Sequence, residues 1–244
     1  MEQWEDQGIV LSVRGHGENG VIVSLLTESN GRHVGYVRGI HSSKMRGTAE
    51  VGNQVDARWQ ARVSDGLGAY QLEPLKSYGP LYMTDSLRLS ALQSACALCD
   101  EALPEREKHA GLYHGLLALF DHLDSDIWAA TYVMWEIAFL RELGFSLDLS
   151  KCAGGGNSDA LAYVSPKTGR AVSVEEGEPY KDKLLKLPAF LGPSGGDTEL
   201  EDILQALSLT GYFLEHWAFT HHTRGVPEQR LRFFERMKNK VDNL

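Results

Sequence analysis

A change of hydrophobic period near Pro80 is the feature that most constrains the fold. Before it, residues 8–75 contain five short runs rich in β-branched and aromatic residues, with turn residues between them. Asn30-Gly31, between the second and third runs, is a strong hairpin signal. Alternation is clearest in the fourth run, where Val55, Trp59 and Val63 are predicted to share the buried face. Five strands in so short a segment predict a small closed barrel.

After Pro80 the apolar residues recur at helical spacing. The first predicted helix begins at a capping residue, Thr84 or Asp85; a later helix ends at Gly144, and the last has Pro227 near its first turn. Between two of these helices, residues 145–196 are irregular and contain clusters of glycine and proline. The sequence therefore predicts an α+β chain with two domains. These are a five-stranded OB-fold barrel over residues 1–79 and an all-α helical domain over residues 80–244, with an irregular insertion at about 145–196.

Composition narrows the class of protein. No run approaches the roughly 18 apolar residues that a membrane span needs. The acidic N-terminus lacks a signal-peptide core, and the three cysteines are too few for a disulfide framework. We therefore expect a cytoplasmic protein with no contact with a membrane.

A local basic segment stands out in a chain whose formal net charge is −9. Residues 29–49 contain four Lys or Arg residues and no acid, and binding to a polyanion follows the local field rather than the total charge. Two further arginines alternate with the apolar residues of the fourth run. The predicted DNA-binding residues are Arg32, Arg38, Lys44, Arg46, Arg58 and Arg62.

Aromatic residues of the barrel could add a stacking surface for bases. Tyr36, Trp59 and Tyr70 are the candidates, and the register of Trp59 with Val55 favours a place in the core. The alternative interpretation of the whole segment is a solvated basic face over an aromatic core. Residues 38–47 are predicted to form a flexible loop between two strands, suited to a phosphate chain or simply to a connection.

Other candidate sites favour structural interpretations. Cys96 and Cys99 lie in an apolar helical run without a second ligand pair and are predicted to be buried, inert thiols. His216, His221 and His222 lack the spacing of a zinc motif. No phosphate-binding loop, nucleophile elbow or paired-carboxylate motif occurs. The sequence predicts no metal, no cofactor and no enzymatic activity.

The order of these features resembles the bacterial RecO family of DNA repair proteins. The opening GIVLSVRGHGENGVIVSLLTESNGRHVGYVRGIHSSKMRG is similar to the start of that family. LYMTDSLRLSALQSACALCDEAL resembles its first helix after the barrel, WEIAFLRELGFSLDLSKCA the helix that leads into a zinc-binding insertion, and YVSPKTGRAV the return strand of that insertion. No single motif is specific, but the ordered set spans nearly the whole chain.

The resemblance implies a zinc finger that this chain has lost. Many members carry two Cys-x-x-Cys pairs in the insertion, whereas here Cys152 matches the first cysteine and Gly155 stands in the place of its partner. Ser173 and Glu176 fall approximately where the second pair would be. One thiolate cannot hold a tetrahedral zinc. We therefore expect the insertion to be held by packing of Leu161, Tyr163, Val164, Val172 and Leu184.

The resemblance also implies a function and partners. A RecO-like protein binds single- and double-stranded DNA, anneals strands and helps to load RecA onto DNA coated by the single-stranded-DNA-binding protein. It works with RecR and in some organisms with RecF. Its helical domain binds the acidic, apolar C-terminal tail of the single-stranded-DNA-binding protein, for which Arg232, Phe233 and Arg236 are the candidates here.

Two other classes of function stay open at this point. One is an adaptor whose barrel docks RecR or another repair partner, with little DNA affinity of its own, and the net charge of −9 favours it. The other is an enzyme acting on nucleotides or nucleic acid, against which the missing motifs argue.

Overall fold

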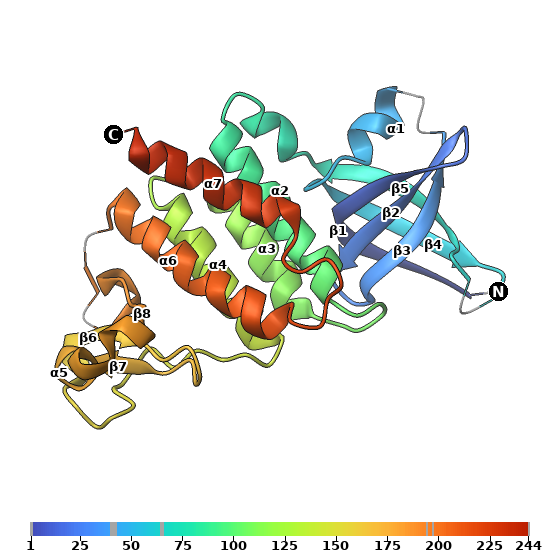
Figure 1. Ribbon diagram of the computed structural model, residues 1–244. Helices are drawn as coiled ribbons and strands as arrows, with labels where there is room; N and C mark the ends of the chain where they lie inside the picture. The colour runs from blue at the N-terminus through green and yellow to red at the C-terminus, as the bar shows by residue number, and fades with distance from the viewer. Residues whose placement is uncertain (1, 40–42, 64–65, 194, 197, 244) are drawn as a thin grey trace. The chain divides into compact units, whose positions relative to one another are not determined.

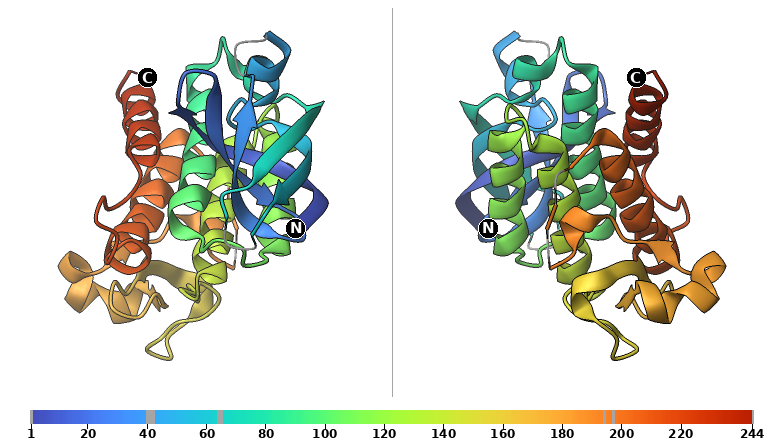
Figure 2. Two further views of the ribbon diagram at one scale, coloured as in Figure 1. Left: turned by 90° about the vertical axis from the view of Figure 1, so that its right-hand side faces the viewer. Right: turned by 90° about the vertical axis from the view of Figure 1, so that its left-hand side faces the viewer.

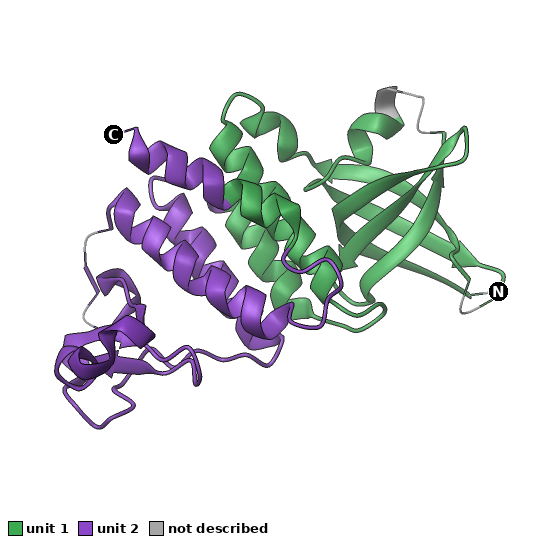
Figure 3. Cartoon of the chain, in the orientation of Figure 1, with its two compact units in different colours: residues 1–121, 227–233 green, residues 122–226, 234–244 purple. Residues whose placement is uncertain are grey.

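The computed structural model describes residues 2–39, 43–63, 66–193, 195–196 and 198–243, with the backbone alone for Ser43 and Lys44 (Figures 1 and 2). The chain forms two compact units, coloured separately in Figure 3. The first contains residues 1–121 and 227–233, and the second contains residues 122–226 and 234–244. The two helices after the barrel belong to the same compact unit as the barrel, and the domain boundary at residue 79 stays a prediction.

Five strands form the predicted closed barrel, in the order β1-β2-β3-β5-β4 (Figure 1). They are β1 (Glu2–His16), β2 (Gly20–Thr27), β3 (Gly31–Arg38), β4 (Gln54–Ala61) and β5 (Ala69–Lys76). Neighbouring strands pair antiparallel, except that β3 meets β5 in parallel at Tyr36 and Ala69. This arrangement agrees with the predicted OB-fold.

The long strand β1 closes the barrel. Residues 2–9 pair with β4, and residues 8–16 pair with β2 in a ladder that a β-bulge interrupts between Val10 and Ser12. A bulge bends a strand and increases its twist, which lets one strand serve two sides of the barrel. The half before residue 8 is polar and was not predicted from the sequence.

The barrel core contains the residues of β4 that alternation predicted. Val55, Ala57 and Trp59 are buried, and Trp59 has no exposed surface. The prediction for Val63 is wrong, because β4 ends at Ala61 and Val63 is 69% exposed. The Asn30-Gly31 hairpin is confirmed, with Gly31 at φ +68°.

The connection from β3 to β4 is more ordered than a flexible loop. It contains the short helix α1 (Ser43–Thr48), whose Met45 packs against the barrel core. The Asn53 amide donates to the carbonyl oxygen of Gly47 at 2.7 Å and fastens the end of this segment. Residues 40–42 of the predicted loop lie outside the described part of the chain.

Two helices complete the first unit. After a 3₁₀ turn, η1 (Gly79–Tyr82), come α2 (Ser86–Ala102) and α3 (Ala110–His122). Asp85 is the predicted cap, since its carboxylate accepts from the backbone N–H groups of Leu87 and Arg88. Lys76 and Tyr78 both donate to Asp121, at 2.5 and 2.8 Å, and so tie the end of β5 to α3.

The second unit contains α4 (Trp128–Glu142), followed at the predicted position by Gly144, and α6 (Leu200–Phe213), which continues as a π-helical turn, η5 (Leu214–Ala218). Helices α4 and α6 pack together and bury a carboxylate between them. Glu136 has no exposed surface and accepts from Tyr132 at 2.9 Å and Thr210 at 2.5 Å. These hydroxyl groups supply the hydrogen bonds that a buried carboxylate requires.

The insertion is a small folded element rather than an irregular one. It comprises η2 (Ser158–Ala160), β6 (Leu161–Val164), β7 (Ala171–Ser173), α5 (Val174–Gly177), η3 (Glu178–Lys183), β8 (Leu185–Lys186) and η4 (Ala189–Leu191). The three strands form a sheet in the order β7-β6-β8. Val164 and Ala171 are fully buried, and the backbone of Gly177 lies against Tyr163 and Leu184. These contacts agree in part with the predicted packing, since Tyr163, Val164 and Leu184 are among the residues expected to hold the insertion.

The last helix, α7 (Glu228–Asp242), begins directly after Pro227, as predicted. Its residues up to Phe233 belong to the first unit and those from Phe234 to the second. Of the helices in the described ranges, none is both long and apolar enough to cross a membrane.

Candidate nucleic-acid interface

One outward face of the barrel gathers cationic and aromatic side chains from β1, β2 and β3. The register sets Arg14 opposite Ile22, which lies opposite Tyr36, and it sets His16 opposite Gly20, which lies opposite Arg38. Directly paired residues project to the same side of a sheet. Val21, Val23 and Val37 fill the barrel interior, so the two rows with even numbers face outward.

A third arginine extends this surface. Tyr36 pairs with Ala69, Ala69 pairs with Gln60, and Arg62 follows Gln60 by two positions, just past the end of β4. Arg62, Val63, Gly66 and Gly68 line a groove beside this row. We call the surface formed by Arg14, His16, Tyr36, Arg38 and Arg62 the basic face.

The arginines of the basic face are available to a ligand. Arg14, Arg38 and Arg62 are exposed, and none has an ion-pair or hydrogen-bond partner among the described residues. Glu18, in the turn that joins β1 to β2, is an acid near the basic face among the described residues. Unpaired cations on one face are what a phosphate backbone requires.

Two predicted residues lie after β3 in α1. Arg46 is exposed in the last turn of this helix. The side chain of Lys44 lies outside the described part of the chain, so its predicted role stays a prediction. The sequence analysis missed Arg14 and His16, although their alternation in the VLSVRGH run places them on the polar side of a strand.

Arg32 occupies a different position from the other predicted cations. Its side chain is only 14% exposed, and its guanidinium lies 3.6 Å from Asp100 and 3.5 Å from Glu105. Its Nε also donates to the carbonyl oxygen of Leu103 at 2.7 Å. Arg32 therefore fastens β3 to the segment after α2, and we remove it from the candidate interface.

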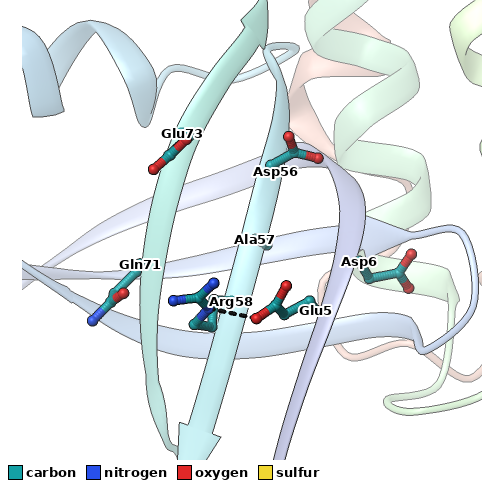
Figure 4. Close-up of a pocket in the computed structure, with 7 residues that line it drawn as sticks. All are labelled: Glu5, Asp6, Asp56, Ala57, Arg58, Gln71 and Glu73. Atoms are coloured by element: carbon teal, nitrogen blue, oxygen red, sulfur yellow. Dashed lines mark hydrogen bonds and ion pairs between the residues drawn. The ribbon is translucent and has the colours of Figure 1, made fainter.

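Arg58 lies on an acidic surface, shown in Figure 4. It forms an ion pair with Glu5 at 2.7 Å in a shallow pocket that is also lined by Asp6, Asp56, Gln71 and Glu73. We call the outward surface formed by Glu5, Asp56, Arg58 and Glu73 the acidic face. Its carboxylates repel phosphates and Glu5 already pairs with Arg58, so we leave Arg58 out of the basic face, contrary to our expectation from the sequence.

The other two candidate stacking residues face inward. Trp59 and Tyr70 are buried beside Trp4 and His33, with Trp4 stacked on Trp59 at 5.7 Å and His33 edge-on to Trp59 at 4.6 Å. The segment after α2 covers this cluster, and the Arg106 guanidinium lies 5.8 Å from the centre of the Trp59 ring. Tyr36 is thus the candidate that the fold leaves on the outside.

His33 gives the barrel a pH-dependent stability. Burial, and then the charge of Arg106, lower the pKa of His33 from 6.5 to about 4. The unfolded chain therefore binds the proton more tightly, and stability falls as the pH drops below about 6.5. Between pH 7.5 and pH 5 we expect wild-type protein to lose about 1–2 kcal/mol more unfolding free energy than His33→Asn. Urea titrations at the two pH values measure this difference, and equal losses would contradict it.

Among the described residues, the other cysteine and histidine side chains do not assemble a metal site. Cys96 and Cys99 are completely buried, as predicted, and burial raises the pKa of both thiols. His216 stacks on Tyr212 with the ring centres 4.1 Å apart. Within the described ranges, no group of three or more His, Cys, Asp or Glu side chains is arranged to hold a metal ion.

Three of the four positions matched to the zinc finger, Cys152, Ser173 and Glu176, lie close together, and the fourth, Gly155, does not join them. The Cys152 Sγ accepts from the backbone N–H of Ser173 at 3.2 Å, and Gly156 lies close to Ser173 and Glu176. Burial acts to raise the pKa of the Cys152 thiol, but hydrogen bonds from Ser173 and from two backbone N–H groups outweigh it and lower the pKa. One sulfur with a hydroxyl and a carboxylate does not fit a structural zinc site, which needs four N or S ligands.

The candidate residues for a partner peptide on α7 differ in accessibility. Arg232 is exposed and forms an ion pair with Glu228 at 2.5 Å, and Arg236 is half-buried. Phe233 has no exposed surface, so it is not available as an apolar contact. The expectation that this phenylalanine forms part of a docking groove is therefore corrected.

A closed five-stranded barrel with this strand order defines a protein of the OB-fold class, a fold that often binds oligonucleotides. Comparison of the sequence with models of protein families identifies one family over most of the chain. Residues 1–78 match the model for the N-terminal part of recombination protein O, and residues 83–219 match the model for its C-terminal part. The chain belongs to the RecO family of DNA repair proteins.

Full-length relatives agree with this assignment. The DNA repair protein RecO of Rhodospirillum centenum is 50% identical over 239 residues, which cover 97% of this chain and 95% of that protein. The protein of the same name from Caulobacter vibrioides (strain NA1000) is 46% identical over 236 residues, which cover 96% and 97%. That from Rhodospirillum rubrum is 45% identical over 245 residues, which cover 98% and 97%.

Proposed function

We propose that this chain binds DNA through the basic face of its barrel and acts as a non-enzymatic recombination mediator. The observation that carries the proposal is the set of three exposed arginines, Arg14, Arg38 and Arg62, that have no partner among the described residues. They surround Tyr36 on a fold that commonly binds oligonucleotides, in a chain whose family acts in DNA repair.

The finer role follows from the family. The chain binds single- and double-stranded DNA, anneals complementary strands and helps to load RecA onto DNA coated by the single-stranded-DNA-binding protein. RecR is its working partner, with RecF in addition in some organisms, and the site of action is the cytoplasm. Phosphate contacts are common to single and double strands, so the arginines of the basic face can serve both.

Docking of the acidic, apolar tail of the single-stranded-DNA-binding protein is also part of the proposal. Arg232 and Arg236 on α7 supply positive charge for the tail. Because Phe233 is buried, the apolar contact must come from another residue.

Salt dependence of DNA binding tests the proposal. Three or four phosphate contacts on a single strand predict that a plot of log affinity against log salt concentration has a slope of about −2 to −3. Fluorescence anisotropy with a labelled single-stranded oligonucleotide, between about 0.05 and 0.2 M monovalent salt, measures the slope. Affinity that does not change with salt, or no binding at the lowest salt, would contradict the proposal.

The acidic face favours a second candidate function. Glu5, Asp56 and Glu73 gather on β1, β4 and β5 and would suit a basic protein surface better than DNA. In this alternative the barrel is an adaptor that docks RecR or another repair partner. Pull-down of RecR with and without nuclease separates the two: capture that survives nuclease, by a chain that fails to bind the oligonucleotide, would support the adaptor.

A further inference from the structure

Tyr36 lies flat on its neighbouring strand. A Cβ atom added to Gly20 would come within 2.2 Å of the Tyr36 hydroxyl oxygen and within 2.3 Å of two ring carbons. The hydroxyl end of the ring therefore lies over the backbone of Gly20, and any other residue at position 20 would displace the Tyr36 side chain. An aromatic ring that covers a cross-strand glycine turns one face to the sheet and the other face outward.

Tyr36 is half-buried, so part of its side chain is accessible to a ligand. The ring of His16 meets Tyr36 edge-on, with the ring centres 5.9 Å apart and the planes at 73°. The backbone N–H of Tyr36 donates to the carbonyl oxygen of Gly68, whereas its hydroxyl has no hydrogen-bond partner in the described part of the chain. The backbone hydrogen bond and the contact with His16 fix the position of Tyr36.

Cations lie on two sides of the ring. Arg38 follows Tyr36 by two positions on the same face, and Arg14 lies across β2 in the same row as Tyr36. The groove lined by Arg62 and Gly68 begins on the other side, at Ala69. A strand whose phosphates meet these arginines would bring its bases over the ring.

We propose that Tyr36 stacks on an unpaired base and so makes the basic face prefer single-stranded over duplex nucleic acid. This inference rests on the proposed function, because the arginines must first hold the strand. Every base has an aromatic face, so the contact tolerates any sequence. In an intact duplex the bases are already stacked and paired, and Tyr36 gains no partner.

Two exchanges at position 36 and three oligonucleotide ligands test the inference. Tyr36→Leu removes the aromatic face, and Tyr36→Phe keeps it. The ligands are a single strand, the same strand with abasic sites throughout, and a duplex of equal length. We expect Tyr36→Leu to bind the single strand about 5- to 100-fold more weakly than wild type, and Tyr36→Phe to bind it within about two-fold of wild type.

The abasic strand is the decisive control. It keeps the phosphates and lacks the bases, so wild type and Tyr36→Leu should bind it equally, with the same salt slope. The wild-type protein by itself provides a second comparison: it should bind the normal strand more tightly than the abasic strand by a similar factor. This result does not depend on how well Tyr36→Leu folds. Duplex affinity should be unchanged by either exchange.

Each outcome separates this inference from the proposed function. If wild type binds all three ligands with a steep salt slope, and Tyr36→Leu binds the single strand equally well, stacking is overturned and phosphate binding stands. If Tyr36→Leu weakens binding to all three ligands by the same factor, Tyr36 supports the sheet and does not contact a base. If wild type binds none of them, the proposed function fails and the stacking contact fails with it.

Discussion

Replacement of Arg14 and Arg38 together by glutamate is expected to weaken binding to a single-stranded oligonucleotide by about 50- to 100-fold at about 0.05 M monovalent salt. Each lost phosphate contact removes about 0.7 from the slope of log affinity against log salt on a single strand. Two lost contacts flatten the slope by about 1.4, and the introduced carboxylates add repulsion. Fluorescence anisotropy across a salt series measures both the affinity and the slope.

The acidic face provides a control that is matched in charge. Arg38→Glu and Arg58→Glu each lower the formal net charge of −9 by two, so they alter the total charge of the protein identically. Arg58 already lies among Glu5, Asp56 and Glu73, where phosphates are repelled. We expect Arg38→Glu to weaken binding and Arg58→Glu to leave it within about two-fold. Equal losses in the two variants would show that total charge, and not the basic face, governs binding.

Local signals in the sequence were sufficient for much of the fold. Alternation in β4, the Asn30-Gly31 turn, the Asp85 cap and Gly144 after α4 each depend on residues within a few positions of one another. The backbone preferences that they express are similar in any surrounding structure. The predicted strands and helices were therefore found at the expected places, apart from their ends.

The first half of β1 could not be predicted in the same way. Residues 2–7 contain Glu2, Glu5 and Asp6 and show no pattern of a buried strand, yet they pair along the length of β4. Their extended conformation is set by a partner strand about fifty to sixty positions away and by the bulge after Val10. The acidic face has the same origin, because it brings together residues from three strands.

Only part of the candidate interface could be predicted from the sequence, because a segment distant in the chain decides which arginines stay exposed. Arg32 and Arg38 both lie on β3 and project from the same side of the strand, and nothing in their own neighbourhood distinguishes them. The difference comes from the segment after α2, which covers Arg32 and leaves Arg38 exposed. Arg14, in contrast, could have been found from the sequence by extending the alternation of the first predicted strand to its end.

The segment that covers Arg32 is itself held closely against β3. Gly31 and Glu107 are in contact, and the backbone N–H of Arg106 donates to the carbonyl oxygen of Arg32 at 2.8 Å. The Arg32 side chain also contacts this segment, through a hydrogen bond to the carbonyl oxygen of Leu103 and an ion pair with Glu105. This double attachment makes Arg32 important for the stability of the first unit, whatever the DNA affinity of the chain.

Replacement of Arg32 by alanine is accordingly expected to lower the free energy of unfolding by about 2–4 kcal/mol. The exchange removes the guanidinium group that lies 3.6 Å from the Asp100 carboxylate, and the Asp100 side chain is only 9% exposed. A buried carboxylate that loses its partner costs more than the pair itself contributed. Urea unfolding monitored by tryptophan fluorescence measures the loss, and the affinity of the folded protein for DNA should change by less than about two-fold.

A double-mutant cycle distinguishes this stabilising role from a DNA contact. If the loss comes from the stranded carboxylate, Arg32→Ala combined with Asp100→Asn should be more stable than Arg32→Ala alone, because the second exchange removes the unpaired charge. Asp100→Asn should have no effect on DNA binding in either background. Arg32→Ala with unchanged stability and about tenfold weaker DNA binding would instead return Arg32 to the interface, since such a result requires a guanidinium that leaves its carboxylates to meet a phosphate.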